Sequence, residues 1–302
     1  MATLKGQNFR LYVDKSVVAM ATSCIVTLNG NTETAETKND VGGAAKPEIA
    51  SKGWSAQVES LDVTDMGLLL NAVKFMRPFT VKWDESAYDN NQTPQGATFA
   101  RQGQAYINDL NFTFNDRTNA SKSIQLSGTG PLDKNVNPDV DLTSTNSFTK
   151  GQNVRLFLSK DDEETHSPIA AALNLSVHVS VSLETSTTKD SVGDWIVQEP
   201  TGYTFDISSS ALVRSGEKIT SAVDACDFAE IEELYESSKP VSFEIANVGG
   251  DNNRDQLTTI MAGYVIITQL AVSAANKTNV TYDAQMQGYG EYLCDDGPNY
   301  NP

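Results

Sequence analysis

Apolar and polar residues alternate in short runs along most of the chain. Ala56 and Val58 alternate with Gln57 and Glu59, and the same period of two recurs in residues 24–29, 123–127 and 204–207. Successive side chains of a strand point to opposite faces, so this period buries one face and leaves the other in water. The pattern therefore predicts antiparallel strands with one apolar and one polar face.

Two segments carry apolar residues at helical spacing instead. They are residues 66–73 and 228–235, where a spacing near 3.6 residues predicts an amphipathic helix. Pro78 and Pro240 each follow the first apolar position by 12 residues, and the period then returns to two. We expect one helix, followed by a strand, in each half of the chain.

The two halves are also similar in sequence. Residues 5–13 return as residues 150–158 with six of nine positions identical, and residues 103–130 align without a gap with residues 263–290. Between these blocks, the triplet at Gly53, Trp54 and Ser55 parallels the triplet at Gly202, Tyr203 and Thr204. Blocks of similarity in a preserved order indicate an internal duplication.

The duplication and the strand pattern together define the expected architecture. We predict a first domain over residues 1–132, a linker without a period over residues 133–149, and a second domain over residues 150–302. The fold class is mainly β (α+β), with two tandem antiparallel β-sandwich or partial-barrel domains, each with one packed helix. Residues 29–52 and 183–202 are long polar stretches, which we interpret as extended loops or hairpins that reach a neighbour.

The charge of the chain excludes one way of binding nucleic acid. The formal net charge is −17, and residues 150–302 contribute −14 of it, from 9 Lys and Arg against 23 Asp and Glu. A protein that grips DNA through its phosphates needs a basic patch. We therefore expect DNA to be repelled.

No residue pattern indicates catalysis, a metal site or a cofactor. Cys24, Cys226 and Cys294 are widely spaced, and His178 lies in a strand pattern that favours a structural histidine. The acidic run at residues 161–164 is better explained as a solvated turn than as a cation site. No apolar run approaches the length of a membrane span, so we predict no cofactor, no enzyme activity and no membrane partner.

One combination of features resembles a known family. A helix set among antiparallel strands, a long loop after the second strand, and the segment from Gly53 to Asp62 before a short helix resemble the major tail tube proteins of long-tailed, siphovirus-like bacteriophages. The resemblance implies a structural virion protein of the tail, assembled in the host bacterial cytoplasm. Its implied partners are further copies of itself, the tape measure, terminator and baseplate proteins, and genomic DNA that passes through without specific binding.

In this family, six tube domains form a ring, and the long loop stacks onto the next ring. Three copies of a duplicated chain would supply six domains, which implies homotrimeric, pseudo-sixfold rings stacked into a hollow conduit for DNA ejection. The candidate lumen-facing residues are Glu59 and Asp206, with an outer-surface position as the alternative for each. The candidates for contacts between rings are Glu33, Glu36, Lys38, Asp40, Glu184, Lys189 and Asp190.

Other classes of protein fit the same pattern of strands. One is another tandem β-sandwich protein of the virion or cell surface, such as a head decoration or a fibre subunit. Another is a carbohydrate-binding module, which needs an exposed aromatic platform, whereas Trp54, Trp83 and Trp195 lie in or beside alternating segments that suggest burial. Tubes, discrete rings or monomers in electron micrographs would separate these classes.

Deletion of residues 34–45 tests the role of the first polar stretch. We expect the variant to fold, because a polar segment contributes little to a core, but not to form tubes. Circular dichroism reports on folding and negative-stain microscopy on assembly. Tubes of normal length would contradict a role in contacts between rings.

Overall fold

The fold was analysed in a computed structural model that describes residues 9–13, 16–18, 21–34, 47–85, 100–134, 148–159, 166–186, 193–213, 225–248 and 257–294. We call the described residues up to 134 the first half and those from 148 onward the second half. The first half contains β1 (Phe9–Val13), β2 (Ser16–Val17), β3 (Ala21–Thr34), β4 (Pro47–Ser60), α1 (Met66–Lys74), β5 (Phe79–Glu85), β6 (Ala100–Asn115) and β7 (Ser121–Asp133).

The second half repeats this order of elements. After a 3₁₀ turn at Gly151–Asn153 it contains β8 (Val154–Ser159), β9 (Ser167–Pro168), β10 (Ala172–Thr185), β11 (Gln198–Leu212), α2 (Phe228–Ser237), β12 (Val241–Asn247), β13 (Thr258–Ser273) and β14 (Thr281–Cys294). Strands pair in the order β2-β1-β5-β6-β7-β4-β3 in the first half and β9-β8-β12-β13-β14-β11-β10 in the second, always antiparallel. The mainly β fold with a helix in each half is therefore confirmed. The domain boundaries stay a prediction.

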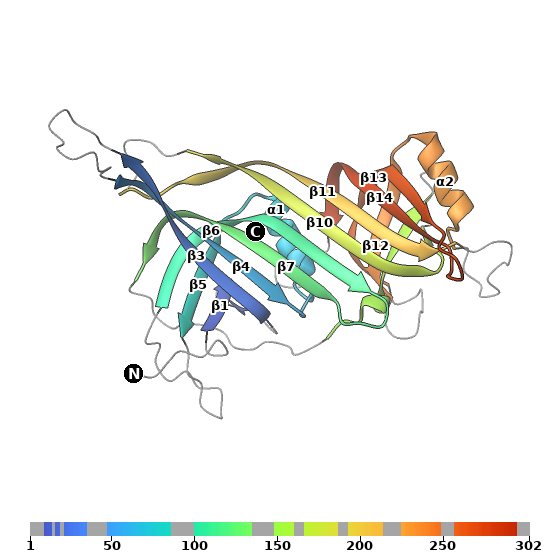
Figure 1. The fold of residues 1–302 in the computed structure, drawn as a ribbon, viewed down its shortest axis with the longest axis horizontal. Coiled ribbons are helices and arrows are strands. Elements are labelled where there is room, and N and C mark those ends of the chain that lie inside the picture. The colour runs from blue at the N-terminus through green and yellow to red at the C-terminus, as the bar shows by residue number, and fades with distance from the viewer. Residues whose placement is uncertain are drawn as a thin grey trace, which may run out of the picture.

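The two halves are not separate sandwiches, because one sheet runs through both (Figure 1). One edge of β6 is shared by two strands: its first part, from Ala100 to Ala105, pairs with β5, and its last part, from Asp109 to Asn115, pairs with β10 of the second half. On the apolar face of this junction, Phe112 lies opposite Val177 and both are fully buried. Side chains of both halves therefore belong to one hydrophobic core.

A large aromatic ring packs over a glycine in each half. Trp54 lies against Gly128, and Phe205 lies against Gly288. The ladders place Ala56 opposite Leu126 in the first half and Ile207 opposite Met286 in the second, and Leu126 and Met286 are equivalent in the gapless alignment. Trp54 is therefore equivalent to Phe205. The sequence parallel between Trp54 and Tyr203 was wrong by two residues, because the ladder and the glycine contact set the register rather than the similar triplets.

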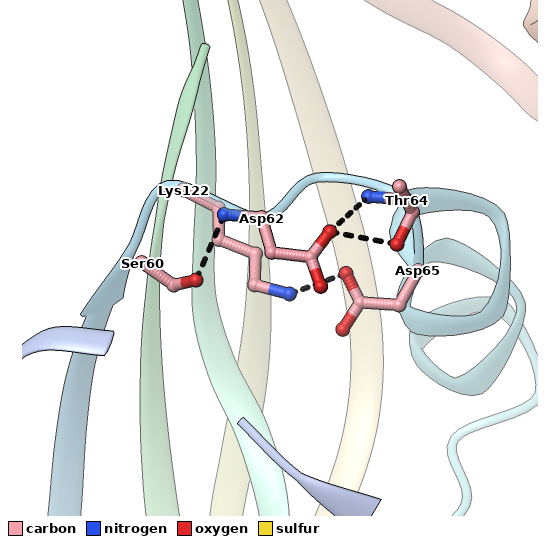
Figure 2. Close-up of polar contacts among 5 residues, drawn as sticks. All are labelled: Ser60, Asp62, Thr64, Asp65 and Lys122. Carbon is pink, nitrogen blue, oxygen red and sulfur yellow. Dashed lines mark hydrogen bonds and ion pairs between the residues drawn. The ribbon is translucent and has the colours of Figure 1, made fainter. Parts of the chain in front are cut away.

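The two helices begin in different ways. Asp227 and Glu230 form a capping box at the start of α2, as expected for an acidic residue at this position. Asp65 precedes α1 but makes no side-chain capping bond. Its carboxylate instead forms an ion pair with the buried Lys122 of β7 (Figure 2).

A short polar network holds the turn before α1. The amide of Asp62 donates to Oγ of Ser60 over 3.0 Å, and the amide of Thr64 donates to Oδ1 of Asp62 over 2.9 Å (Figure 2). Burial raises the pKa of Asp65, and the neighbouring Lys122 ammonium opposes that rise. The turn and the ion pair fix where α1 starts.

No helix in the described residues is long and apolar enough to span a membrane.

The contact between Trp54 and Gly128 gives a direct test of the core. A Cβ atom added at Gly128 would lie 2.2 Å from the Trp54 ring, so we expect Gly128→Ala to lower the free energy of unfolding by about 1–3 kcal/mol. The matched control is Gly202→Ala in β11, where no heavy atom lies within 4 Å of the added Cβ. We expect it to change stability by less than about 0.5 kcal/mol. Equal urea midpoints for the two variants would contradict this packing.

Candidate functional site: the polar face and free edges of the sheet

Eight strands form a continuous surface in the order β3-β4-β7-β6-β10-β11-β14-β13. Residues directly opposite each other on neighbouring strands point to the same face, so the register defines both faces. One face belongs to the core. The other is polar and carries Ser55, Gln57, Glu59, Ser123, Gln125, Asp109, Asn111, Thr113, Ser176, His178, Ser180, Thr204, Asp206, Ser208, Gln285 and Gln287.

Both predicted lumen residues lie on this polar face. Glu59 of β4 is exposed and lies opposite Ser123 of β7. Asp206 of β11 is exposed and lies opposite His178 and Gln287. Strands β7, β6 and β10 separate them, so at about 4.8 Å per strand they are too far apart to form one site. They mark two parts of a shared surface.

A small polar cluster sits on this face where the two halves meet. His178 Nε2 of β10 lies 2.7 Å from Asp109 Oδ2 of β6, and its Nδ1 lies 4.0 Å from Asp206 Oδ2. Next to it, the Ser176 hydroxyl donates to Asn111 Oδ1 over 2.9 Å. His178 is thus a hydrogen-bonded structural histidine, as its sequence context predicted. Its partner is 69 residues away, which local sequence could not indicate.

The described residues show no metal site on this face or elsewhere. Within the described ranges, no group of three or more His, Cys, Asp or Glu side chains is arranged to hold a metal ion. The chemistry of the face is therefore that of exposed hydroxyls, amides and carboxylates. Such groups form hydrogen bonds with water and with solutes.

The eight-stranded surface ends in two edges, formed by β3 and β13. They are equivalent to the strands that pair where β6 meets β10, which we call the inner junction. Strand β3 is the equivalent of β10, and in the described residues its partner is β4 alone. The last part of β13 is equivalent to the part of β6 that pairs with β10, and there β13 pairs with β14 alone. At the inner junction, the edges of β6 and β10 are paired with each other. The equivalent edges of β13 and β3 have no such partner in the described residues.

The exposed edges keep the apolar pattern of the buried junction. Leu28 of β3 is 65% exposed, whereas its equivalent Val179 is 0% exposed. Val272 of β13 is 54% exposed, whereas its equivalent Phe112 is 0% exposed. Large apolar residues that are exposed on unpaired strand edges favour association with another strand.

The long polar stretches are hairpin arms in their described parts. The β3–β4 pairing continues to Thr34 opposite Pro47, and the β10–β11 pairing to Thr185 opposite Gln198. Of the predicted contacts between rings, Glu33 lies in β3 and Glu184 in β10, and both are exposed. The other candidates lie outside the described residues: Glu36, Lys38, Asp40, Lys189 and Asp190.

The loop end of the second arm contacts the first half. The amide of Ile196 donates to the carbonyl of Lys52 over 2.8 Å, and the amide of Gly130 donates to the carbonyl of Ile196 over 2.9 Å. The Lys52 ammonium also pairs with Asp194 at 3.3 Å. Figure 1 shows the ends of β10 and β11 reaching toward the β3–β4 arm. One arm of this chain thus already docks on a neighbouring unit.

No protein-family model and no curated protein sequence matches the chain. It is similar to solved structures from tails and virions. One is described as the tail of an empty GTA particle with C6 symmetry, at 15% identity and a TM-score of 0.39 over 49% of this chain and 98% of that chain.

Two further structures are similar over the same share of the chain. The SPP1 tail tube matches at 16% identity and a TM-score of 0.37, over 48% of this chain and 78% of that chain. The virion of a native gene transfer agent particle matches at 14% identity and a TM-score of 0.36, over 49% of this chain and 98% of that chain.

The inner junction allows a comparison of its two faces. Phe112→Ala removes a fully buried ring, so we expect it to lower the free energy of unfolding by about 3–5 kcal/mol. His178→Ala removes a partly exposed polar contact and should cost less than about 1 kcal/mol. Urea unfolding of both variants measures the difference. A larger loss for His178→Ala would show that the polar face holds the halves together.

Proposed function

We propose that the chain is a structural subunit of a phage tail tube, in which three copies close into a pseudo-sixfold ring and rings stack into a hollow conduit for DNA ejection. The observation that carries this proposal is the match between the inner junction and the two free edges. In each half, four strands belong to the eight-stranded surface. Three copies would therefore give a closed surface of six such units.

The inner junction supplies the register of the outer one. If β13 of one copy pairs with β3 of the next as β6 pairs with β10, Val272 lies opposite Val26 of the next copy. Leu270 then lies opposite Leu28 of that copy. The pairing would bury the exposed apolar side chains of both edges and satisfy their backbone groups. A head-to-tail contact of this kind closes into a ring when its rotation allows, and removes both edges.

The polar face supports its placement on the inside of such a ring. Both helices have their buried residues in the core on the other face of the sheet, so that face is the bulkier one and belongs outside. The paired positions of the polar face, within the described residues, include Glu59, Asp109, Asp206 and Asp283 but no lysine or arginine. An acidic wall repels the phosphates of DNA and lets the polyanion pass without binding.

The remaining parts of the proposal follow from the role of a tail tube subunit. The hairpin arms would contact the adjacent ring. The tape measure protein would occupy the conduit, with terminator and baseplate proteins at its two ends. Assembly in the host bacterial cytoplasm and a place in the virion tail belong to the same proposal.

The substitution Leu28→Glu tests the edge pairing. Leu28 is 65% exposed in the single chain, so the fold should tolerate a carboxylate there within about 0.5 kcal/mol. In the ring the same carboxylate would be buried without a partner, so we expect rings and tubes to be lost. Sedimentation velocity and negative-stain microscopy measure both states.

A matched control places the same charge elsewhere on the surface. Leu68 of α1 is 43% exposed, and Leu68→Glu should assemble as the unmodified chain does. Tubes from the Leu28→Glu variant would contradict the pairing of β3. An unmodified chain that stays monomeric at all concentrations, or forms fibres without a lumen, would overturn the proposed function.

A further inference from the structure

Helix α1 does more than cover its own half, because it also contacts the end of β14 in the second half. The Tyr292 hydroxyl donates to the carbonyl of Leu70 over 2.7 Å, and Cys294 Sγ donates to Asn71 Oδ1 over 2.8 Å. The Lys74 ammonium donates to the carbonyl of Tyr292 over 3.0 Å. These hydrogen bonds thus link helix α1 of the first half to β14, the last strand of the second half.

Helix α2 is the counterpart of α1 in the second half. The equal spacing from helix to proline makes Glu232, Glu233 and Glu236 the equivalents of Leu70, Asn71 and Lys74. Leu70 and Asn71 are buried, whereas all three glutamates are exposed. The buried side of α2, at Ile231 and Leu234, faces its own half. The outer side of α2 therefore keeps the position of a contact surface but carries carboxylates.

The strand ladders identify the surface that would face α2. Asp133 lies opposite Gln102 in the first half, and Leu293 lies opposite Ala262 in the second. Asp133 and Leu293 are therefore equivalent, which makes Lys134 the equivalent of Cys294. Since Asn71 contacts Cys294 inside the chain, the matching pair between two chains is Glu233 and Lys134, which have opposite charges.

We propose that α2 docks on the end of β7 in a second copy of this chain, with Glu233 paired to the partner's Lys134. This inference rests on the proposed ring, since the same rotation that joins β13 to β3 brings α2 to β7. The occupant is a second copy because the contact continues an interface that exists within the chain, and because the charges at the two equivalent positions are complementary. The inner contact also includes an ion pair, between the Lys74 ammonium and Glu291 Oε2 at 3.7 Å, and the outer contact should likewise depend on charge and therefore on salt.

Charge reversal tests the pair. Glu233→Lys and Lys134→Glu should each place like charges together and raise the subunit concentration needed for half-maximal assembly by about tenfold. The double variant restores opposite charges and should assemble within about twofold of the unmodified chain. Circular dichroism of the single chains checks folding. Single variants that assemble normally, or a double variant no better than either single one, would overturn the pairing.

Disulfide trapping locates the contact directly. One chain carries Glu233→Cys and a second, differently tagged chain carries Lys134→Cys, and mild oxidation should give a mixed dimer only when both are present. As an internal control, Asn71→Cys should bond to Cys294 within a single chain. Tubes that form without the mixed dimer would overturn this contact and leave the proposed function standing. Failure of the unmodified chain to assemble would overturn both.

Discussion

The structure depends on how the backbone of β6 uses one edge for two partners. Its first part pairs with β5 and its last part with β10, so a strand of one half completes the sheet of the other. An unpaired strand edge exposes backbone hydrogen-bond donors and acceptors, which favour pairing with another strand. Within the chain, β6 and β10 satisfy each other's edges. The equivalent edges, on β13 and β3, lie at the two ends of the eight-stranded surface.

That constraint explains the distribution of exposed apolar residues. Phe112 and Val179 are fully buried because the neighbouring half covers them, while the equivalent Val272 and Leu28, which lack a second neighbouring strand among the described residues, are exposed. The exposed residues therefore occupy the positions that are equivalent to buried positions at the inner junction. The polar face makes no comparable demand, since exposed hydroxyls and carboxylates can form hydrogen bonds with water.

Sequence reasoning could predict the elements of the fold but not how the halves join. The period of two and the spacing of the helices are local signals, and both were confirmed. The alternation also put Glu59 and Asp206 on a polar face. The β6–β10 pairing was missed, because strands 65 residues apart, such as those of Ser176 and Asn111, leave no local trace. The equivalence of Trp54 and Phe205 was missed because similar triplets suggested another register.

The duplicated halves have diverged where their surroundings differ. Lys122 reaches Asp65 at the start of α1, whereas its equivalent Tyr282 packs its ring 5.2 Å from that of Phe228 at the start of α2. α2 relies on its own capping box instead. The helix held within the chain carries an asparagine and a lysine toward the next unit, and the terminal helix carries glutamates. In the proposed ring, the opposite charges of Glu233 and the partner's Lys134 would favour this pairing over others.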